Sequence, residues 1–488
     1  MVWILHLSDL HRSPTAPIPD HLLTESVMRE VTKLRGGDSG VDLIVVSGDL
    51  IQGSKQDDLV AATAEVDRQY AETRALLELL VQHLLGGKWD RVVIVPGNHD
   101  ICWAHSKASM NRVVLPPDPA ERAGYVRRYL AQGSSSHLRW SWADLCFFEI
   151  DNDELYESRL ASFGRFLNDL PRSDDHPWRD EPAARYTIQV FDQFELCVVG
   201  FSSCHKLDHL NHIGSIHPEA IAAAEEEIRR QGVAEYRKVA VWHHNTRGGP
   251  ADSDYMHDHV LEMLTALDYS LGIHGHQHRS EVVYRHSNVD ESQTLAVISA
   301  ASLCAGAREL PPGHNRGFNI VQLDASSVSI WPRELLTLSE FMVWQPRRLP
   351  SGEEVRKVPL RTSRVGHVDL RKRILWLYDE KRLLDMANVI ERSGGLQDHS
   401  LRALWIEALE ELGEDVRLGA MLPTTGSEAI SVLAALERAG DHQRLAARLS
   451  EPWAANTTDA SVSDFVGRLT ARLRVQSLLR RREGASRD

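Results

Sequence analysis

The sequence predicts an α/β domain whose sheets are covered by helices, followed by a smaller all-α domain. Over the first two thirds of the chain, short apolar runs typical of buried strands alternate with longer helical patterns. Beyond residue 365, nearly every segment repeats apolar residues at the spacing of a helix. A chain of 488 residues is also too long for one ordinary core. We therefore place the α/β domain at 1–343, a linker rich in proline and charge at 344–365 and the helical domain at 366–488.

Short apolar runs are the predicted strands of the first domain, because β-branched side chains fill both faces of a covered sheet. They are WILHLSD (3–9), DLIVVSGD (42–49), RVVIVPGN (91–98), FELCVVGF (194–201), KVAVWHHN (238–245) and YSLGIHGH (269–276). Past residue 278 the pattern becomes strand after strand, which predicts hairpins that complete a second sheet.

Two helices of this domain have clear sequence signals. Residues 56–85 repeat apolar residues at helical spacing and stop at Gly86-Gly87, a common end of a helix. Residues 218–231 begin with Pro218 and are acidic in the first turns, as helix starts prefer. An insertion at about 101–193 separates the third and fourth strands.

Composition narrows the class of protein. Hydrophobic residues make up 42% and charged residues 25%, the balance of a soluble globular protein. No apolar run is long enough to span a membrane, and the N-terminus lacks the features of a signal peptide. The five cysteines include no CxxC pair, so we expect reduced thiols and a cytoplasmic location. The net charge of −14 argues against a surface coated for non-specific DNA binding but leaves room for a local basic groove.

Metal-type side chains follow five of the predicted strands at their carboxyl ends, the edge where open α/β sheets bind ligands. Turns have no need of paired histidines, so this set predicts a metal site. Imidazole, carboxylate and amide groups without a thiolate suit a divalent ion such as Mn, Fe, Zn or Ni. The residues are Asp9, His11, Asp49, Asn98, His99, Asp100, His243, His244, His274, His276 and His278.

These motifs, in this order, resemble those of the calcineurin-like metallophosphoesterase superfamily. They read Asp9-Leu10-His11, Gly48-Asp49, Gly97-Asn98-His99-Asp100, His243 and Gly275-His276-Gln277-His278. The resemblance covers roughly residues 1–335 and implies a two-sheet α/β/β/α sandwich that binds two divalent metal ions. It implies that one ion is held by Asp9, His11, Asp49 and His278, and the other by Asp49, Asn98, His243 and His276.

The resemblance also implies a hydrolase of phosphoric esters. Two ions about 3.5–4 Å apart lower the pKa of a bridging water and clamp the phosphoryl oxygens, which favours in-line attack of hydroxide on phosphorus. His99 is expected beside the metals as an acid or electrostatic group for the leaving oxygen, with Asp100 orienting it. A purely structural metal site is disfavoured, because such a site closes its coordination shell.

Arg12 and His244 are weaker candidates for contact with the substrate. Arg12 lies just past His11 and has a guanidinium that suits phosphate, although an ordinary surface arginine fits the pattern equally well. His244 follows His243 on one strand and should point to the opposite side, where support of the ligands fits better than ligation.

The insertion and one later loop are candidates for substrate selection. Insertions in the resembled superfamily form caps that decide the substrate. The tryptophans of the insertion either stack on a base or pack a small core, and the histidines of the loop at 202–214 form either part of the substrate rim or an ordinary polar loop. These residues are Trp103, Trp140, Trp142, Trp178, His205, His209 and His212.

The leading hypothesis is a phosphodiesterase acting on a nucleotide, a cyclic nucleotide or a nucleic acid. The segments HLSDLH and VSGDL resemble the cyclic-nucleotide phosphodiesterase and repair-nuclease branches more than the protein-phosphatase branch, since Arg12 and not Gly follows His11. The alternative is a signalling or defence effector whose helical domain recruits a protein partner or self-associates, with a nuclease as its output. No membrane partner is expected.

Overall fold

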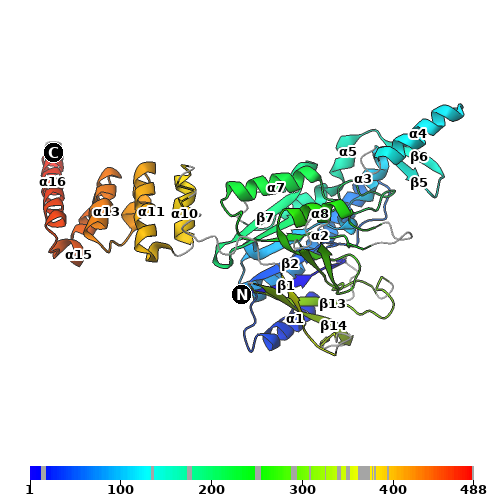
Figure 1. The fold of residues 1–488 in the computed structure, drawn as a ribbon, viewed down its shortest axis with the longest axis horizontal. Coiled ribbons are helices and arrows are strands. Elements are labelled where there is room, and N and C mark those ends of the chain that lie inside the picture. The colour runs from blue at the N-terminus through cyan, green and yellow to red at the C-terminus, as the bar shows by residue number, and fades with distance from the viewer. Residues whose placement is uncertain are drawn as a thin grey trace. The chain divides into compact units, whose positions relative to one another are not determined.

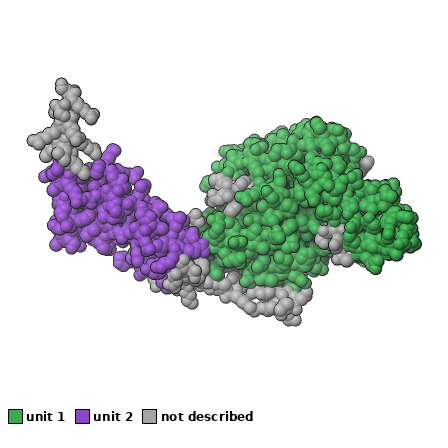
Figure 2. All heavy atoms as spheres, turned by 90° about the horizontal axis from the view of Figure 1, so that it is seen from above, with its two compact units in different colours: residues 1–366 green, residues 367–488 purple. Residues whose placement is uncertain are grey.

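The computed structural model divides the chain into two compact units, Met1–Gly366 and His367–Asp488 (Figure 2). It describes residues 1–12, 18–132, 137–172, 178–247, 254–286, 294–306, 309–324, 326–337, 342–347, 352–360, 374–375, 377–378, 381–392 and 395–485. Unit 1 is the predicted α/β domain and unit 2 is helical, so the predicted fold class is confirmed.

The first sheet of unit 1 has seven strands in the order β15-β14-β13-β1-β2-β3, with β16 also paired to β14. Its β1, β2 and β3 are parallel, and β13 runs antiparallel to β1. These strands are β1 (Val2–Leu7), β2 (Leu43–Ser47), β3 (Val92–Val95), β13 (Gly317–Leu323), β14 (Ser327–Thr337), β15 (Val343–Pro346) and β16 (Arg356–Pro359).

The second sheet has six strands in the order β11-β12-β10-β9-β8-β7. Its β8, β9, β10 and β12 are parallel, while the outer strands β7 and β11 are antiparallel to their neighbours. They are β7 (Tyr186–Phe191), β8 (Leu196–Phe201), β9 (Arg237–Val241), β10 (Tyr269–His274), β11 (Val282–His286) and β12 (Thr294–Ser299).

The two sheets pack face to face and helices cover their outer faces. Alternate residues of each strand point to opposite sides, so β1 sends Ile4 between the sheets and Leu5 to the helices. Val239 and Val241 of β9 meet this inner layer, whereas Ala240 faces α7 and α8. Figure 1 shows α7 and α8 on one side of the sandwich and α1 on the other. The covering helices are α1 (Asp20–Leu34), α2 (Leu59–Leu85), α7 (Pro218–Arg230) and α8 (Asp258–Ala266).

Local signals set the ends of the long helices. The Asp58 carboxylate caps α2 by accepting from the Ala61 N–H at 2.8 Å, and the helix ends at Gly86 with φ 61°. Pro218 occupies the first turn of α7, where its missing N–H costs no hydrogen bond.

The insertion contributes its own small sheet, ordered β4-β6-β5, and several short helices (Figure 1). Trp178 is buried in the core beside Phe163, whereas Trp142 at the tip of the β5–β6 turn is 82% exposed. The elements are α3 (Trp103–Ala108), β4 (Met110–Arg112), α4 (Pro119–Gln132), β5 (Leu138–Ser141), β6 (Cys146–Ile150), α5 (Asp153–Glu157) and α6 (Ala161–Asn168).

Two boundaries and one sheet assignment differ from the sequence prediction. The insertion predicted at 101–193 ends before β7, whose alternating buried and half-buried residues pair with β8 as an edge strand. The stretch 344–365, predicted as a linker, contains most of β15 and all of β16, because Trp344 and Val358 bury their side chains in the core. Strands β13 and β14 complete the first sheet and not the second, since β13 has apolar residues on both faces and fits beside β1.

Unit 2 has its own hydrophobic core, formed by residues from all its longer helices. Asp398 caps α11 and Thr425 caps α13, so each of these helix starts is marked by an oxygen-bearing side chain. The helices are α10 (Leu383–Arg392), α11 (His399–Leu412), α12 (Asp415–Ala420), α13 (Gly426–Arg438), α14 (His442–Leu449), α15 (Pro452–Ala455) and α16 (Ala460–Ala485).

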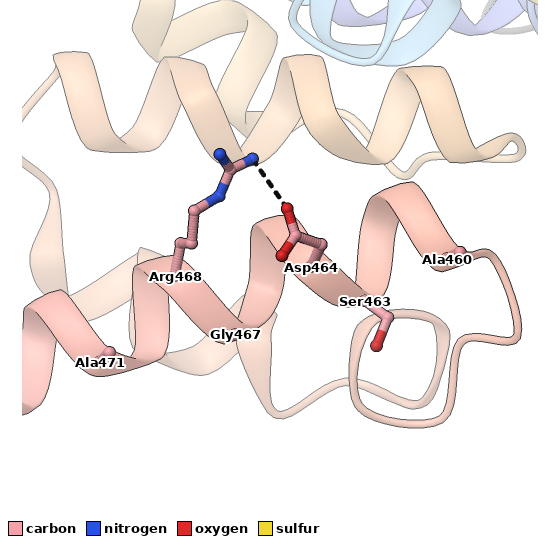
Figure 3. A pocket seen from close by; sticks show the side chains of 6 residues that line it. All are labelled: Ala460, Ser463, Asp464, Gly467, Arg468 and Ala471. Carbon is pink, nitrogen blue, oxygen red and sulfur yellow. Dashed lines mark ion pairs between the residues drawn. The ribbon is translucent and has the colours of Figure 1, made fainter.

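One face of α16 carries mostly small residues, among them Ala460, Ser463, Gly467 and Ala471 (Figure 3). Arg468 also lies on it and pairs with Asp464 at 3.3 Å, one helical turn earlier. Within the described part of the chain no helix is long and apolar enough to cross a membrane. The five cysteines are buried and unpaired.

Truncation tests the corrected boundary. We expect a fragment of residues 1–366 to unfold at a clearly higher temperature than a fragment of residues 1–350, because the shorter one lacks β16 and leaves the places of Val358 and Leu360 in the core empty. Each fully buried aliphatic side chain contributes roughly 1.5–3 kcal/mol. Equal unfolding midpoints in scanning calorimetry would show that 344–365 is a linker after all.

Candidate metal centre

The predicted ligands follow strand ends that have an unusual backbone. Asp9, His11, Asp49, His276 and His278 all have positive φ, between 44° and 73°. Residues other than glycine rarely adopt this conformation, which costs roughly 1–3 kcal/mol and is concentrated at functional sites. Hydrogen bonds between the loops that follow β1 and β2 hold this backbone conformation in place. The backbone N–H of Asp9 donates to the Gly48 carbonyl and that of His11 to the Asp49 carbonyl, both at 3.0 Å.

A first cluster joins Asp9, His11 and His278, whose ligand atoms lie within 4.8 Å of one another. The His278 Nε2 is 3.2 Å from the Asp9 Oδ1 and 3.2 Å from the His11 Nε2. Asp9 is fully buried, and His278 is largely so. This cluster brings the ends of β1 and β10 together across the two sheets.

A second cluster joins Asp49, His243 and His276. The His243 Nε2 lies 3.2 Å from the Asp49 Oδ2 and 3.0 Å from the Asn98 Oδ1. The His276 Nδ1 lies 2.9 Å from the same Asn98 oxygen and 3.2 Å from the His243 Nε2. Oxygen and nitrogen atoms from the ends of β2, β3, β9 and β10 therefore converge on one point.

The outer hydrogen bonds of the histidines indicate which ring nitrogen carries a lone pair toward the site when the ring is neutral. The Nδ1 of His243 faces the Ser47 carbonyl at 2.8 Å, and the Nδ1 of His278 faces the Glu309 carbonyl at 2.7 Å. A carbonyl only accepts, so each Nδ1 carries the hydrogen and each Nε2 of a neutral ring is unprotonated. His276 donates its Nε2 hydrogen to Asp254 at 3.0 Å, which frees its Nδ1. Lone pairs 3.2 Å apart repel unless a cation lies between them, so this donor set fits divalent metal ions.

Asp49 belongs to both halves of the site. It is a member of the second cluster and of a third group with His11 and His99, so its carboxylate lies between the two sets of imidazoles. Gly97 makes this possible, because a Cβ there would come within 2.2 Å of the Asp49 Oδ1. The geometry fits the predicted bridging position of Asp49.

Charge within the clusters changes the pKa of their members. Burial would lower the pKa of His243, but the Asp49 carboxylate outweighs it and raises the pKa to about 9. Burial would also lower the pKa of His278, but the Asp9 carboxylate outweighs it and raises the pKa to about 9. Burial dominates at His11 and lowers the pKa to about 4. A metal ion therefore competes with protons at His243 and His278 and must release them on binding.

His99 lies at the site, but Asp100 does not orient it. The backbone N–H of His99 donates to the Asp49 Oδ1 at 2.8 Å, and the ring Nδ1 of His99 donates to the Gln52 carbonyl at 2.9 Å. Asp100 is fully buried below the loop, where it accepts from the Gly97 N–H at 2.7 Å and from the Tyr70 hydroxyl at 3.0 Å. Burial, with the charge of Asp49, raises the pKa of Asp100 to about 7. The predicted orienting role thus passes to the Gln52 carbonyl, and Asp100 shapes the loop.

The structure gives no support to the predicted substrate contacts of Arg12 and His244. Arg12 is buried and its guanidinium pairs with Asp20 and with the Ile18 carbonyl. His244 is fully buried, its Nδ1 lies 2.8 Å from the Ser203 Oγ, and its ring packs 5.0 Å from that of His276. Its ring also lies 5.3 Å from that of His243, so it packs against two histidines of the second cluster.

Four residues that position the predicted ligands and His99 could not be found from the sequence pattern. Ser47, Gln52 and Glu309 act through their backbone carbonyls, which any residue type supplies. Asp254 reaches His276 from a loop with no motif. His274 is buried against Trp242, with the rings stacked at 5.9 Å, and is not among the converging ligands.

Comparison with known proteins identifies the family. A model of calcineurin-like phosphoesterases matches residues 2–280. No curated protein matches the chain. Similar solved structures include Vps29 from Entamoeba histolytica with Zn²⁺ (10% identity, 73% of this chain and 98% of that chain, TM-score 0.26), TT1561 of Thermus thermophilus (12%, 66% and 93%, 0.28) and a putative 5′-nucleotidase from Staphylococcus aureus (13%, 77% and 58%, 0.30). Because the family match spans more than half of the chain and contains every predicted metal ligand and the whole GNHD motif, this protein belongs to the calcineurin-like phosphoesterase family.

Proposed function

We propose that unit 1 is a dinuclear metal-dependent phosphodiesterase that acts on a nucleotide-type phosphoester. The observation that carries this proposal is the position of Asp49, whose carboxylate belongs to ligand groups on both sides of it, with the His99 ring on the same edge of the sandwich. A site built for one structural ion has no use for a shared carboxylate and a neighbouring imidazole that is not needed as a ligand.

The residues divide the work of the reaction. When bound, two divalent ions supply a water of lowered pKa and a positive clamp for the phosphoryl oxygens. Asp9, His11 and His278 would hold one of them, Asn98, His243 and His276 would hold the other, and Asp49 would serve both. His99 keeps its Nδ1 hydrogen on the Gln52 carbonyl, so its Nε2 is the atom that carries a proton to the leaving oxygen.

A diester is favoured over a monoester by the charge around the ligands. Arg12 follows the first motif but is held by Asp20, away from the site. Asp254 contributes a carboxylate beside His276, with its oxygen 3.0 Å from the His276 Nε2. A phosphodiester carries one negative charge, so an acidic group beside the ligands repels it less than it repels a monoester with two charges. A substrate panel of cyclic mononucleotides, dinucleotides, DNA, RNA and aryl phosphates with Mn-loaded protein tests the class directly.

Substitution of Asp49 tests the shared carboxylate. We expect Asp49→Asn to lose both ions and all activity, because the second cluster loses its one carboxylate and the first keeps only that of Asp9, whereas Asp57→Asn, which removes an exposed carboxylate paired with Lys107, should keep both. Elemental analysis after dialysis against Mn²⁺ measures the ions per chain, and circular dichroism checks the fold. Two ions retained in a folded Asp49→Asn protein would refute the assignment.

Substitution of His99 tests its proposed role as the general acid that protonates the leaving oxygen. We expect His99→Gln to keep its metal content but to lose roughly 10²–10⁴-fold in kcat for diesters with poor leaving groups, which need the proton. The loss should shrink for nitrophenyl esters, whose leaving oxygen is stable without one. An equal loss across a series of aryl esters of differing leaving-group acidity would argue that His99 acts by charge or by shape alone.

A further inference from the structure

Two aromatic residues outside the ligand set lie against the second cluster. Trp103 begins α3, directly after the loop that carries Asn98, and its indole N–H donates to the Asn98 carbonyl at 3.3 Å. The ring of His212 packs on it, with 5.4 Å between the ring centroids and 38° between the planes. Trp103 is half-buried and His212 is exposed, so the pair presents an aromatic surface to solvent beside a metal ligand.

The loop that carries His212 also passes close to the second cluster, because a Cβ at Gly214 would lie 2.4 Å from the His244 ring, which packs 5.0 Å from that of His276. Asp254 bonds the His276 Nε2 at 3.0 Å, and its neighbour Tyr255 accepts from the Gly214 N–H of the His212 loop. The pair Trp103–His212 therefore lies beside the Asn98 loop, and the loop of His212 contacts the segment of Asp254.

The loop that carries His212 is anchored on both sides. Before it, Asp208 accepts from the Asn211 N–H at 3.0 Å and from the Arg139 Nε at 2.6 Å, which ties the loop to the insertion. After it, the Gly214 N–H donates to the Tyr255 carbonyl at 3.1 Å, which ties the loop to the segment of Asp254. An exposed histidine held between two such anchors is preorganised, and preorganised side chains bind at a low entropic cost.

We infer that Trp103 and His212 form the wall on which a phosphoester substrate stacks a planar aromatic group, and that this group is the base of a nucleoside. This inference rests on the proposed function, because it needs the phosphate at the metal clusters. Tryptophan and histidine are side chains that stack on bases, and one stacked base contributes roughly 1–3 kcal/mol to binding. Of the tryptophans of the insertion, Trp178 packs in a core, whereas Trp103 bonds the backbone of the Asn98 loop and is the candidate for stacking on a base.

Binding of two matched ligands tests it. Adenosine 5′-monophosphate and ribose 5-phosphate share the phosphate and sugar and differ only in the base. We expect Mn-loaded protein to bind the adenosine ligand at least about fivefold more tightly in isothermal titration calorimetry, the low end of what one stacked base contributes. His212→Ala should remove most of that preference without weakening ribose 5-phosphate, His212→Phe should retain it, and the control His259→Ala, which removes an exposed histidine on α8, should leave it unchanged.

Kinetics with a matched pair of diesters separates the two proposals. Thymidine 5′-(4-nitrophenyl phosphate) and methyl 4-nitrophenyl phosphate release the same phenolate, and His212→Ala should raise KM for the first alone. Hydrolysis of both esters with equal ligand binding and equal KM values would overturn the wall and leave the phosphodiesterase standing. Retention of the base preference in His212→Lys but not in His212→Phe would also overturn it, because a charge and not a ring would then be the cause. Absence of both binding and hydrolysis would overturn the proposed function and the wall together.

Discussion

The Asp49 carboxylate joins the two sheets of unit 1. It stands at the end of β2 in the first sheet, 3.2 Å from the His243 imidazole, which follows β9 in the second sheet, and it accepts the His99 N–H at 2.8 Å. A buried carboxylate is costly unless it is paired, and here its two partners follow two other strands, β9 and β3. Without it, the imidazoles of His243 and His276 would have no carboxylate in their cluster, and Asp9 alone would supply negative charge to the converging ligands. The positive φ values of the ligand residues are strain that this arrangement must hold in place.

Much of this site is predictable from sequence because its ligands lie in short motifs at strand ends. Parallel strands bring their carboxyl ends to one edge, so Asp9, Asp49 and Asn98 had to be neighbours once β1, β2 and β3 were recognised. The match of a family model to residues 2–280 and the observed fold agree with that expectation. The ligand roles of individual residues, the metals and the substrate remain predictions and proposals.

Other features could not be predicted, for identifiable physical reasons. The orientation of His99 depends on a backbone carbonyl at Gln52, and backbone groups leave no trace in a residue pattern. Arg12 is buried and pairs with Asp20, at the start of α1, and the residue pattern alone does not reveal this tertiary contact. The strand β16 lies in a stretch whose prolines and charges resemble a linker, and only the burial of Val358 and Leu360 shows its role. The predicted recruitment of a partner by the helical unit stays a prediction.

Anomalous diffraction from crystals soaked in Mn²⁺ tests the central claim most directly, because it locates each ion independently of activity. The account predicts two peaks per chain, one among Asp9, His11 and His278 and one among Asn98, His243 and His276, with the Asp49 carboxylate between them. A single peak, or two peaks with Asp49 bound to only one, would contradict the shared carboxylate on which the proposed reaction depends.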